Sequence, residues 1–181
     1  MELAGIPCEV LVTDADETIS GPPAEQVRGL ALRKAEAAGD IIGGKPAVII
    51  AADTLVYVDG AVLGKPESRE DAFQMLRTLS GRKHTVYTGV AILVQSEQGA
   101  VSCPLSLFVD STDVYFRELS DKEINAYIDT GEPFDKAGAY GVQERGSILV
   151  DRVEGDFYTV VGLPISKVWS ALNGMGIKTW L

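Results

Sequence analysis

Cysteine and histidine are scarce in this chain, which has two cysteines and one histidine among 181 residues. Cys8 and Cys103 stand far apart and form no CxxC or metal-finger spacing, so we expect two reduced, partly buried thiols. His84 cannot supply a histidine-based metal cluster alone, and no GxSxG nucleophile elbow accompanies it. These shortages argue against a zinc site and a Ser-His-Asp triad, and they indicate a structural or surface role for His84.

Long apolar runs and positive charge are also scarce. No run approaches the roughly 20 apolar residues that span a bilayer, and the first residues show no signal-peptide pattern. A formal net charge of −10 argues against binding nucleic acid or an anionic membrane through a basic surface. We therefore expect a cytoplasmic protein. A small polyanionic substrate remains compatible, because it needs only a local cluster of cations.

The length fits one domain, and the patterning predicts both strands and helices. Two serines, Ser68 and Ser120, have an acidic residue three positions later, the spacing of a capping box at the start of a helix. Hairpins alternate with helical crossovers, which predicts an α/β fold with a mixed sheet flanked by helices. The expected strands are 8–12, 47–52, 55–58, 61–63, 85–94, 101–116, 147–153 and 157–161, and the expected helices are 24–38, 68–79, 120–128 and 164–172.

Two short motifs have residue types suited to phosphate chemistry. Asp53 follows a buried apolar run, and a carboxylate at a strand end can bind Mg²⁺ or deprotonate a water. An aspartate that caps a turn with its own backbone is an equally good interpretation. In Gly64-Lys65-Pro66, a lysine between a glycine and a rigid proline suits a phosphate contact. The motif lacks Walker A spacing, however, and such a tripeptide is more often a plain turn.

Two further segments can bind a ligand. Residues 135–143 combine small residues with charges and an amide, which allows close approach of a backbone to a ligand, although a flexible loop fits equally well. Asp14, Asp16 and Glu17 offer oxygen ligands for a divalent cation. The alternative for these three is an acidic surface turn, because they lack the EF-hand spacing.

The motifs in their order resemble the Maf family of nucleotide pyrophosphatases, from about Gly5 to Leu172. The resemblance implies an inosine-triphosphatase-like α/β fold, with two lobes and a cleft, that is often dimeric. It also implies cleavage of a nucleoside triphosphate between the α- and β-phosphates with a divalent metal, Mg²⁺ or Mn²⁺. The segments that carry the resemblance are Glu17, 30–35, 52–54, 63–66, 79–82, 135–140 and 161–164.

Individual roles follow from the same resemblance. Asp53 matches the proton acceptor for the attacking water and is a possible metal ligand, while Glu17 matches a position that helps to hold the metal. Lys34 and Lys65 match positions that neutralise phosphate oxygens. Phosphoryl hydrolysis needs these parts in any case: a base near the water and cations for the developing charge.

Base choice is implied by two further positions, Thr54 and Gln143. The wording Asp-Lys-Ala-Gly-Ala-Tyr-Gly-x-Gln over 135–143 is similar to the subgroup that acts on dTTP and UTP. The 7-methyl-GTP subgroup has a cysteine-containing variant that is absent here. We therefore expect a pyrophosphatase that converts dTTP and UTP to the monophosphate and pyrophosphate.

One departure concerns the start of the chain. The family opens with a strand and a Ser-x-Ser-Pro-Arg-Arg loop, which this sequence does not contain. We therefore expect residues 1–181 to form a single Maf-like domain that is N-terminally truncated relative to the family. Because the absent arginines would contact phosphate, the alternative to an active enzyme is a catalytically weakened nucleotide-binding or regulatory homologue.

Overall fold

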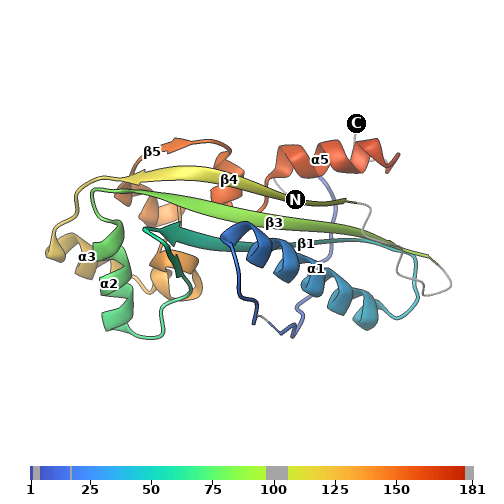
Figure 1. Ribbon diagram of the computed structural model, residues 1–181, viewed down its shortest axis with the longest axis horizontal. Helices are drawn as coiled ribbons and strands as arrows, with labels where there is room; N and C mark the ends of the chain where they lie inside the picture. The colour runs from blue at the N-terminus through green and yellow to red at the C-terminus, as the bar shows by residue number, and fades with distance from the viewer. Residues whose placement is uncertain (2–4, 17, 97–105, 178–181) are drawn as a thin grey trace. The chain divides into compact units, whose positions relative to one another are not determined.

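The computed structural model describes residues 1, 5–16, 18–96 and 106–177. Five strands in these ranges form one sheet in the order β2-β1-β3-β4-β5 (Figure 1). They are β1 Ala47–Val58, β2 Ala61–Leu63, β3 Lys83–Gln95, β4 Ser106–Phe116 and β5 Val150–Glu154. The sheet is antiparallel, is flanked by helices and does not close into a barrel. The expected α/β architecture is confirmed. The protein combines helices with strands, but the sheet does not combine parallel with antiparallel strands.

The chain divides into two compact units. Unit 1 comprises residues 1–53, 88–110 and 162–181, and unit 2 comprises residues 54–87 and 111–161. The long strands β1, β3 and β4 therefore each contribute residues to both units. None of the described helices combines the length and the apolar character needed to cross a membrane.

Unit 1 contains α1 Pro23–Ile42 and α5 Ile165–Gly174. The apolar stripe of α1 is buried along its length, as helical spacing predicted, and Gly43 ends the helix in the left-handed conformation. The helix lies very close to β3, because a Cβ built on Gly89 would be 2.2 Å from the carbonyl oxygen of Val27. Only glycine fits at this contact.

Unit 2 contains α2 Arg69–Leu79, α3 Asp121–Ile128 and the short α4 Phe157–Val161. Helices α2 and α3 lie side by side (Figure 1). The predicted capping box of α3 is present, with Ser120 and Glu123 bonded reciprocally. In α2, Ser68 caps the helix as expected.

Residues 8–12, expected as a strand, have no regular secondary structure. Val10 is 90% exposed and Val12 is 86% exposed, so burial of these side chains does not stabilise the strand that their pattern suggested. Cys8 is a free thiol that is exposed rather than partly buried, and Cys103 lies outside the described residues.

Two separate strands were expected at 47–52 and 55–58, but the structure has the single strand β1. The polar residues Asp53 and Thr54 do not interrupt it, since a side chain of either kind is compatible with a strand that is paired along its backbone. Asp53 therefore lies in the middle of a strand rather than at its carboxyl end.

A hairpin between 147–153 and 157–161 was also expected, and it is wrong. Residues 144–149 form a 3₁₀ helix, and β5 pairs with β4, with Val153 opposite Val114. Residues 157–161 are helical, because Asp156 accepts a hydrogen bond from the backbone N–H of Tyr158 and starts a helical turn. Strand β5 thus pairs with the edge of β4 instead of with residues 157–161.

His84 is buried in the core of unit 2, with 2% of its surface exposed, so the structural role is the one it has here. Its Nε2 lies 2.7 Å from the hydroxyl oxygen of Tyr140, and its ring packs edge-on against Phe116 and Tyr140. Its Nδ1 has no hydrogen-bond partner in the described part of the chain. Burial lowers the pKa of His84 to about 4, against a smaller opposing effect of Asp113.

Gly89→Ala is expected to lower the free energy of unfolding by about 2 kcal/mol or more, because its Cβ meets the backbone of α1 rather than a movable side chain. Urea unfolding measures the change. Gly174→Ala is the matched control, since a Cβ there meets nothing within 4 Å and alanine favours helix. Equal stability of both variants would contradict this packing.

The burial of His84 predicts a loss of stability in acid. Between pH 6.5 and about 4 the unfolded chain binds a proton at this residue that the folded chain does not. The contribution of neutral, buried His84 to the free energy of unfolding is therefore full above pH 6.5. It declines by about 3 kcal/mol as the pH falls to 4. Urea unfolding of the wild type and His84→Gln measures it, because the gap between the two curves must shrink toward low pH. A constant gap would show that His84 keeps its ordinary pKa.

Candidate functional site

Lys34 and Asp53, both predicted from the sequence, are brought together in unit 1. Nζ of Lys34 donates to Oδ1 of Asp53 at 2.6 Å. The side chains are only 25% and 12% exposed, so the pair is screened less than a surface pair. The alternative of an aspartate that caps a turn is wrong, because Asp53 lies inside β1.

The closeness of α1 to the sheet allows Lys34 to reach β1. Ala31 and Ala35 are fully buried and Ala38 nearly so, and they pack with Ile49 of β1. Alanine side chains hold a helix nearer to a sheet than larger residues would. A lysine on the neighbouring positions of α1 can then reach the strand with its ammonium group.

A hollow of about 290 Å³ lies beside the pair in unit 1. Lys34 and Ala38 of α1 line it, together with residues 48–52 of β1 and with Glu9 and Thr13 of the N-terminal segment. Lys34, which contacts Asp53, is one of the lining residues, so the hollow adjoins the ion pair.

Two other predicted motifs meet in unit 2. Lys65 is exposed in the loop between β2 and α2, and its neighbour Pro66 is buried. The backbone N–H of Gly138 donates to the carbonyl of Gly64 at 2.9 Å, which ties this loop to residues 135–143. Hydrogen bonding by Lys136 lowers the pKa of Asp135, and the charge of Lys65 contributes a smaller part.

Gly138 explains why small residues are needed in 135–143. Its φ is +68°, and a Cβ there would lie 2.9 Å from a methyl group of Val56 in β1. Thr54 lies two residues before Val56 on the same strand, and side chains two apart share a face of a strand. Thr54 is thus on the face of β1 that these small residues approach.

Gln143 is exposed in the loop 141–146. The surrounding segment is not a plain flexible loop, since 3₁₀ helices form at Glu132–Asp135, Ala137–Ala139 and Glu144–Leu149. The backbone of this segment is therefore held on both sides of Gln143. The amide is therefore presented to solvent from an ordered support.

A metal site is not completed by the described residues, which hold no group of three His, Cys, Asp or Glu side chains. Glu17, predicted to help hold the metal, lies outside the described residues. Asp16 accepts the N–H of Thr18 and pairs with Arg33, which fits the alternative of an acidic surface turn. The hydrogen bond from Thr18 lowers the pKa of Asp16.

Sequence reasoning missed Glu132 and Tyr127. Glu132 accepts hydrogen bonds from the hydroxyl of Tyr127 and from the backbone N–H groups of Arg145 and Gly146. The signal in the sequence was only a glutamate between Gly131 and Pro133, which is common in turns. The contacts are made with residues 13 and 14 positions later, so no local pattern shows them.

Comparisons with known proteins identify the family of the chain. The chain matches the family model described as Maf-like protein over residues 1–175. A dTTP/UTP pyrophosphatase of Caldanaerobacter subterraneus subsp. tengcongensis is 44% identical over 180 residues, 98% of this chain and 84% of that protein. Proteins of the same name from Bacillus anthracis and Bacillus thuringiensis subsp. konkukian are each 42% identical over 179 residues, 98% of this chain and 89% of theirs. The chain therefore belongs to the Maf family.

Proposed function

We propose that this chain is a nucleoside triphosphate pyrophosphatase that hydrolyses dTTP and UTP to the monophosphate and pyrophosphate. The observation that carries the proposal is the half-buried Lys34–Asp53 pair beside a hollow in unit 1. Relatives that are 42–44% identical over almost the whole chain are named dTTP/UTP pyrophosphatase, which supports the same substrates here.

Asp53 is the proposed base. In the reaction, the oxygen of a water forms a bond to the α-phosphorus, the bond from that phosphorus to the bridging oxygen breaks, and pyrophosphate leaves. The carboxylate of Asp53 accepts the proton of the water. Its place within β1 supports this role, because a base on a strand keeps its position without a loop having to close.

Lys34 is proposed to bind the phosphates and to orient Asp53. An ammonium group has three donors, so it can contact a carboxylate and a phosphate oxygen together. The distance of 2.6 Å to Asp53 shows that the first of these contacts is formed. Lys34 therefore links the base to the position of the substrate's negative charge.

Three residues of unit 2 are also proposed to bind substrate, as the family resemblance implies. Lys65 extends from a loop that is anchored through Gly64, and its exposed ammonium suits a phosphate oxygen. Gln143 and Thr54 are proposed to choose the base, since an amide and a hydroxyl offer both donors and acceptors.

We also propose Mg²⁺ or Mn²⁺ as the cofactor. Mg²⁺ commonly binds through one or two carboxylates and the phosphates of a substrate, so Asp53 with the triphosphate fits even though a three-residue cluster is absent from the described residues. Such a cation would neutralise charge that develops on the phosphate oxygens. Glu17 is the second proposed ligand.

The proposed assembly is a homodimer, as the family resemblance implies, and we propose the cytoplasm as its location. The side chains of Phe157, Tyr158 and Val161 support self-association, because α4 leaves each of them 37–41% exposed.

Asp53→Asn is expected to lower kcat for dTTP and UTP by at least about 100-fold, because an amide cannot accept the proton of the water. Pyrophosphate release with Mg²⁺ or Mn²⁺ measures it. Asp59→Asn is the matched control: Asp59 is exposed in the β1–β2 turn, pairs with Arg82, and should leave kcat unchanged.

A full rate in Asp53→Asn would refute the assignment of the base. Calorimetry that shows nucleotide binding without turnover by the wild type would favour the weakened nucleotide-binding homologue. Preference for ITP or XTP over dTTP and UTP would instead indicate a broad inosine-triphosphatase-like enzyme.

Lys34→Met is expected to lower the free energy of unfolding by about 1–3 kcal/mol, because it removes the ammonium from a carboxylate that is only 12% exposed. Adding Asp53→Asn should restore part of that loss, with a coupling energy of about 1 kcal/mol or more. Urea unfolding of the wild type, both single variants and the double variant measures the coupling. Strictly additive changes in the free energy of unfolding would show that the pair adds nothing to stability. Lys45→Met, at an exposed position, is the control for loss of a lysine.

A further inference from the structure

Buried Tyr127 and half-buried Glu132 form an anchor beneath the loop that carries Gln143. The hydroxyl of Tyr127 donates to Oε1 of Glu132 at 2.9 Å, and the same hydroxyl accepts the backbone N–H of Gly141 at 3.2 Å. Burial raises the pKa of Tyr127, so its hydroxyl stays protonated and able to donate. Tyr127 thereby holds the first residue of the loop 141–146.

Glu132 holds the other end of the same loop. Its Oε1 accepts the N–H of Gly146 at 3.0 Å, and its Oε2 accepts the N–H of Arg145 at 3.3 Å. The two ends meet closely, since a Cβ on Gly146 would lie 2.1 Å from the carbonyl oxygen of Gly141 and 2.7 Å from the hydroxyl of Tyr127. Loop 141–146 is thus closed at its base and held by one tyrosine and one glutamate.

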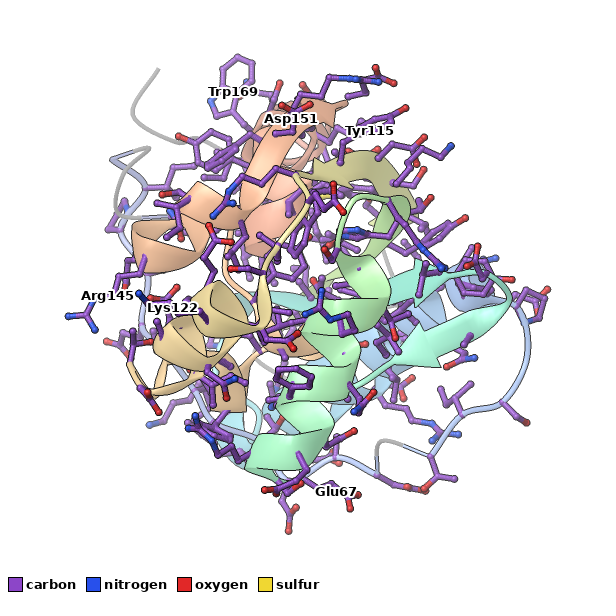
Figure 2. All side chains as sticks on the ribbon, turned by 90° about the vertical axis from the view of Figure 1, so that its left-hand side faces the viewer. Glu67, Tyr115, Lys122, Arg145, Asp151 and Trp169 are labelled. Carbon is purple, nitrogen blue, oxygen red and sulfur yellow. The ribbon has the colours of Figure 1, made fainter. Side chains whose placement is uncertain are left out.

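The exposed part of the loop is held in an unusual conformation. Glu144, directly after Gln143, has φ +53°, a region that residues other than glycine rarely adopt. The hydroxyl of Ser147 donates to its carbonyl at 2.6 Å. The side chain of Arg145 extends outward from the protein (Figure 2), so its link to Glu132 is through the backbone alone. Backbone contacts therefore set the direction in which Gln143 leaves the loop.

We propose that Tyr127 and Glu132 are positioning residues for base selection, which hold loop 141–146 so that Gln143 leaves it in one direction and its amide reaches the nucleobase. This inference rests on the proposed function and on the proposed role of Gln143 within it. Neither Tyr127 nor Glu132 needs to touch the substrate.

The position of the amide matters because the pyrimidine bases differ at one edge. Uracil and thymine present an N–H donor at N3 beside a carbonyl acceptor at O4, whereas cytosine presents an acceptor at N3 beside an amino donor at N4. A glutamine amide can pair with either pattern by exchanging its oxygen and nitrogen, and the backbone contacts leave that turn free. The anchor fixes the place from which the amide reaches this edge, so a loop that shifts weakens the contact on which the proposed choice of base depends. Loss of the anchor should therefore lower the ratio of kcat/KM for UTP to kcat/KM for CTP.

The kinetic test uses Tyr127→Phe, which keeps the ring and removes the hydroxyl. We expect the UTP/CTP ratio of kcat/KM to fall about three- to ten-fold, the range for loss of one hydrogen bond, mainly through a higher KM for UTP. Glu132→Gln tests the second anchor, because its amide N–H₂ would face the N–H of Arg145, and the ratio should fall in the same direction. A role in folding alone would lower the rates for UTP and CTP by the same factor and leave the ratio unchanged.

Unit 2 offers a matched control pair. Tyr115 also donates its hydroxyl to a glutamate at 2.9 Å, that of Glu154. In Figure 2, Tyr115 and Arg145 lie well apart. Tyr115→Phe and Glu154→Gln remove the same kind of bond and should leave the UTP/CTP ratio unchanged. A fall in their ratio as large as that of Tyr127→Phe would overturn the inference.

A double variant tests whether Tyr127 acts through Gln143. If it does, Tyr127→Phe changes the UTP/CTP ratio in the wild type but not in Gln143→Ala, where no amide remains to be positioned. Multiplicative effects of the two substitutions would overturn the inference. So would a Tyr127→Phe enzyme with an unchanged ratio.

Hydrogen exchange tests the anchor without reference to activity. The amides of Gly141 and Arg145 should exchange slowly in the wild type and faster in Tyr127→Phe and Glu132→Gln, respectively. Fast exchange in the wild type would refute the anchor itself. A wild type with protected amides but no turnover of any nucleoside triphosphate would refute the proposed function and base selection with it. An active wild type with an unchanged ratio in both variants would refute this inference alone.

Discussion

The close packing of α1 on the sheet is the constraint on which the ion pair between Lys34 and Asp53 in unit 1 depends. The pair forms only because α1 lies close to the sheet, and that closeness requires alanines on the buried face of the helix and no side chain at Gly89. A larger residue at any of these positions would move the ammonium away from the carboxylate. The packing of the apolar face of α1 and the chemistry proposed for the Lys34–Asp53 pair therefore depend on the same small residues.

In unit 2, the loops that carry Lys65 and Gln143 are held through their backbone. Gly138 donates to the carbonyl of Gly64, and Tyr127 and Glu132 accept from the backbone between Gly141 and Gly146. The exposed side chains of Lys65 and Gln143, which are proposed to bind the substrate, make no part of these bonds. Because only the backbone of each loop is used to hold it, these side chains can contact a ligand.

Local features of the fold were predictable from the sequence. The capped helices and the Asp59-Gly60 turn depend on residues within four positions of each other, and they lie where the patterns placed them. Residues 8–12 and 157–161 were wrongly predicted as strands, because a strand exists only where a partner edge is available. The family resemblance placed Lys34 and Asp53 in one site but did not predict their ion pair, and the anchor of Tyr127 and Glu132 joins residues that no pattern relates.

The position of Asp53 in the middle of β1 has an evolutionary consequence. A strand that is bonded to its neighbours tolerates few changes, whereas a loop closed at its base by two side chains can exchange its outer residues without disturbing the sheet. Mutation in a descendant of this chain can thus change the exposed residues 143–145, which include the residue proposed to choose the nucleobase, while the proposed hydrolytic residue stays in place. Such a division lets one ancestral hydrolase give rise to enzymes that differ in substrate and share a reaction.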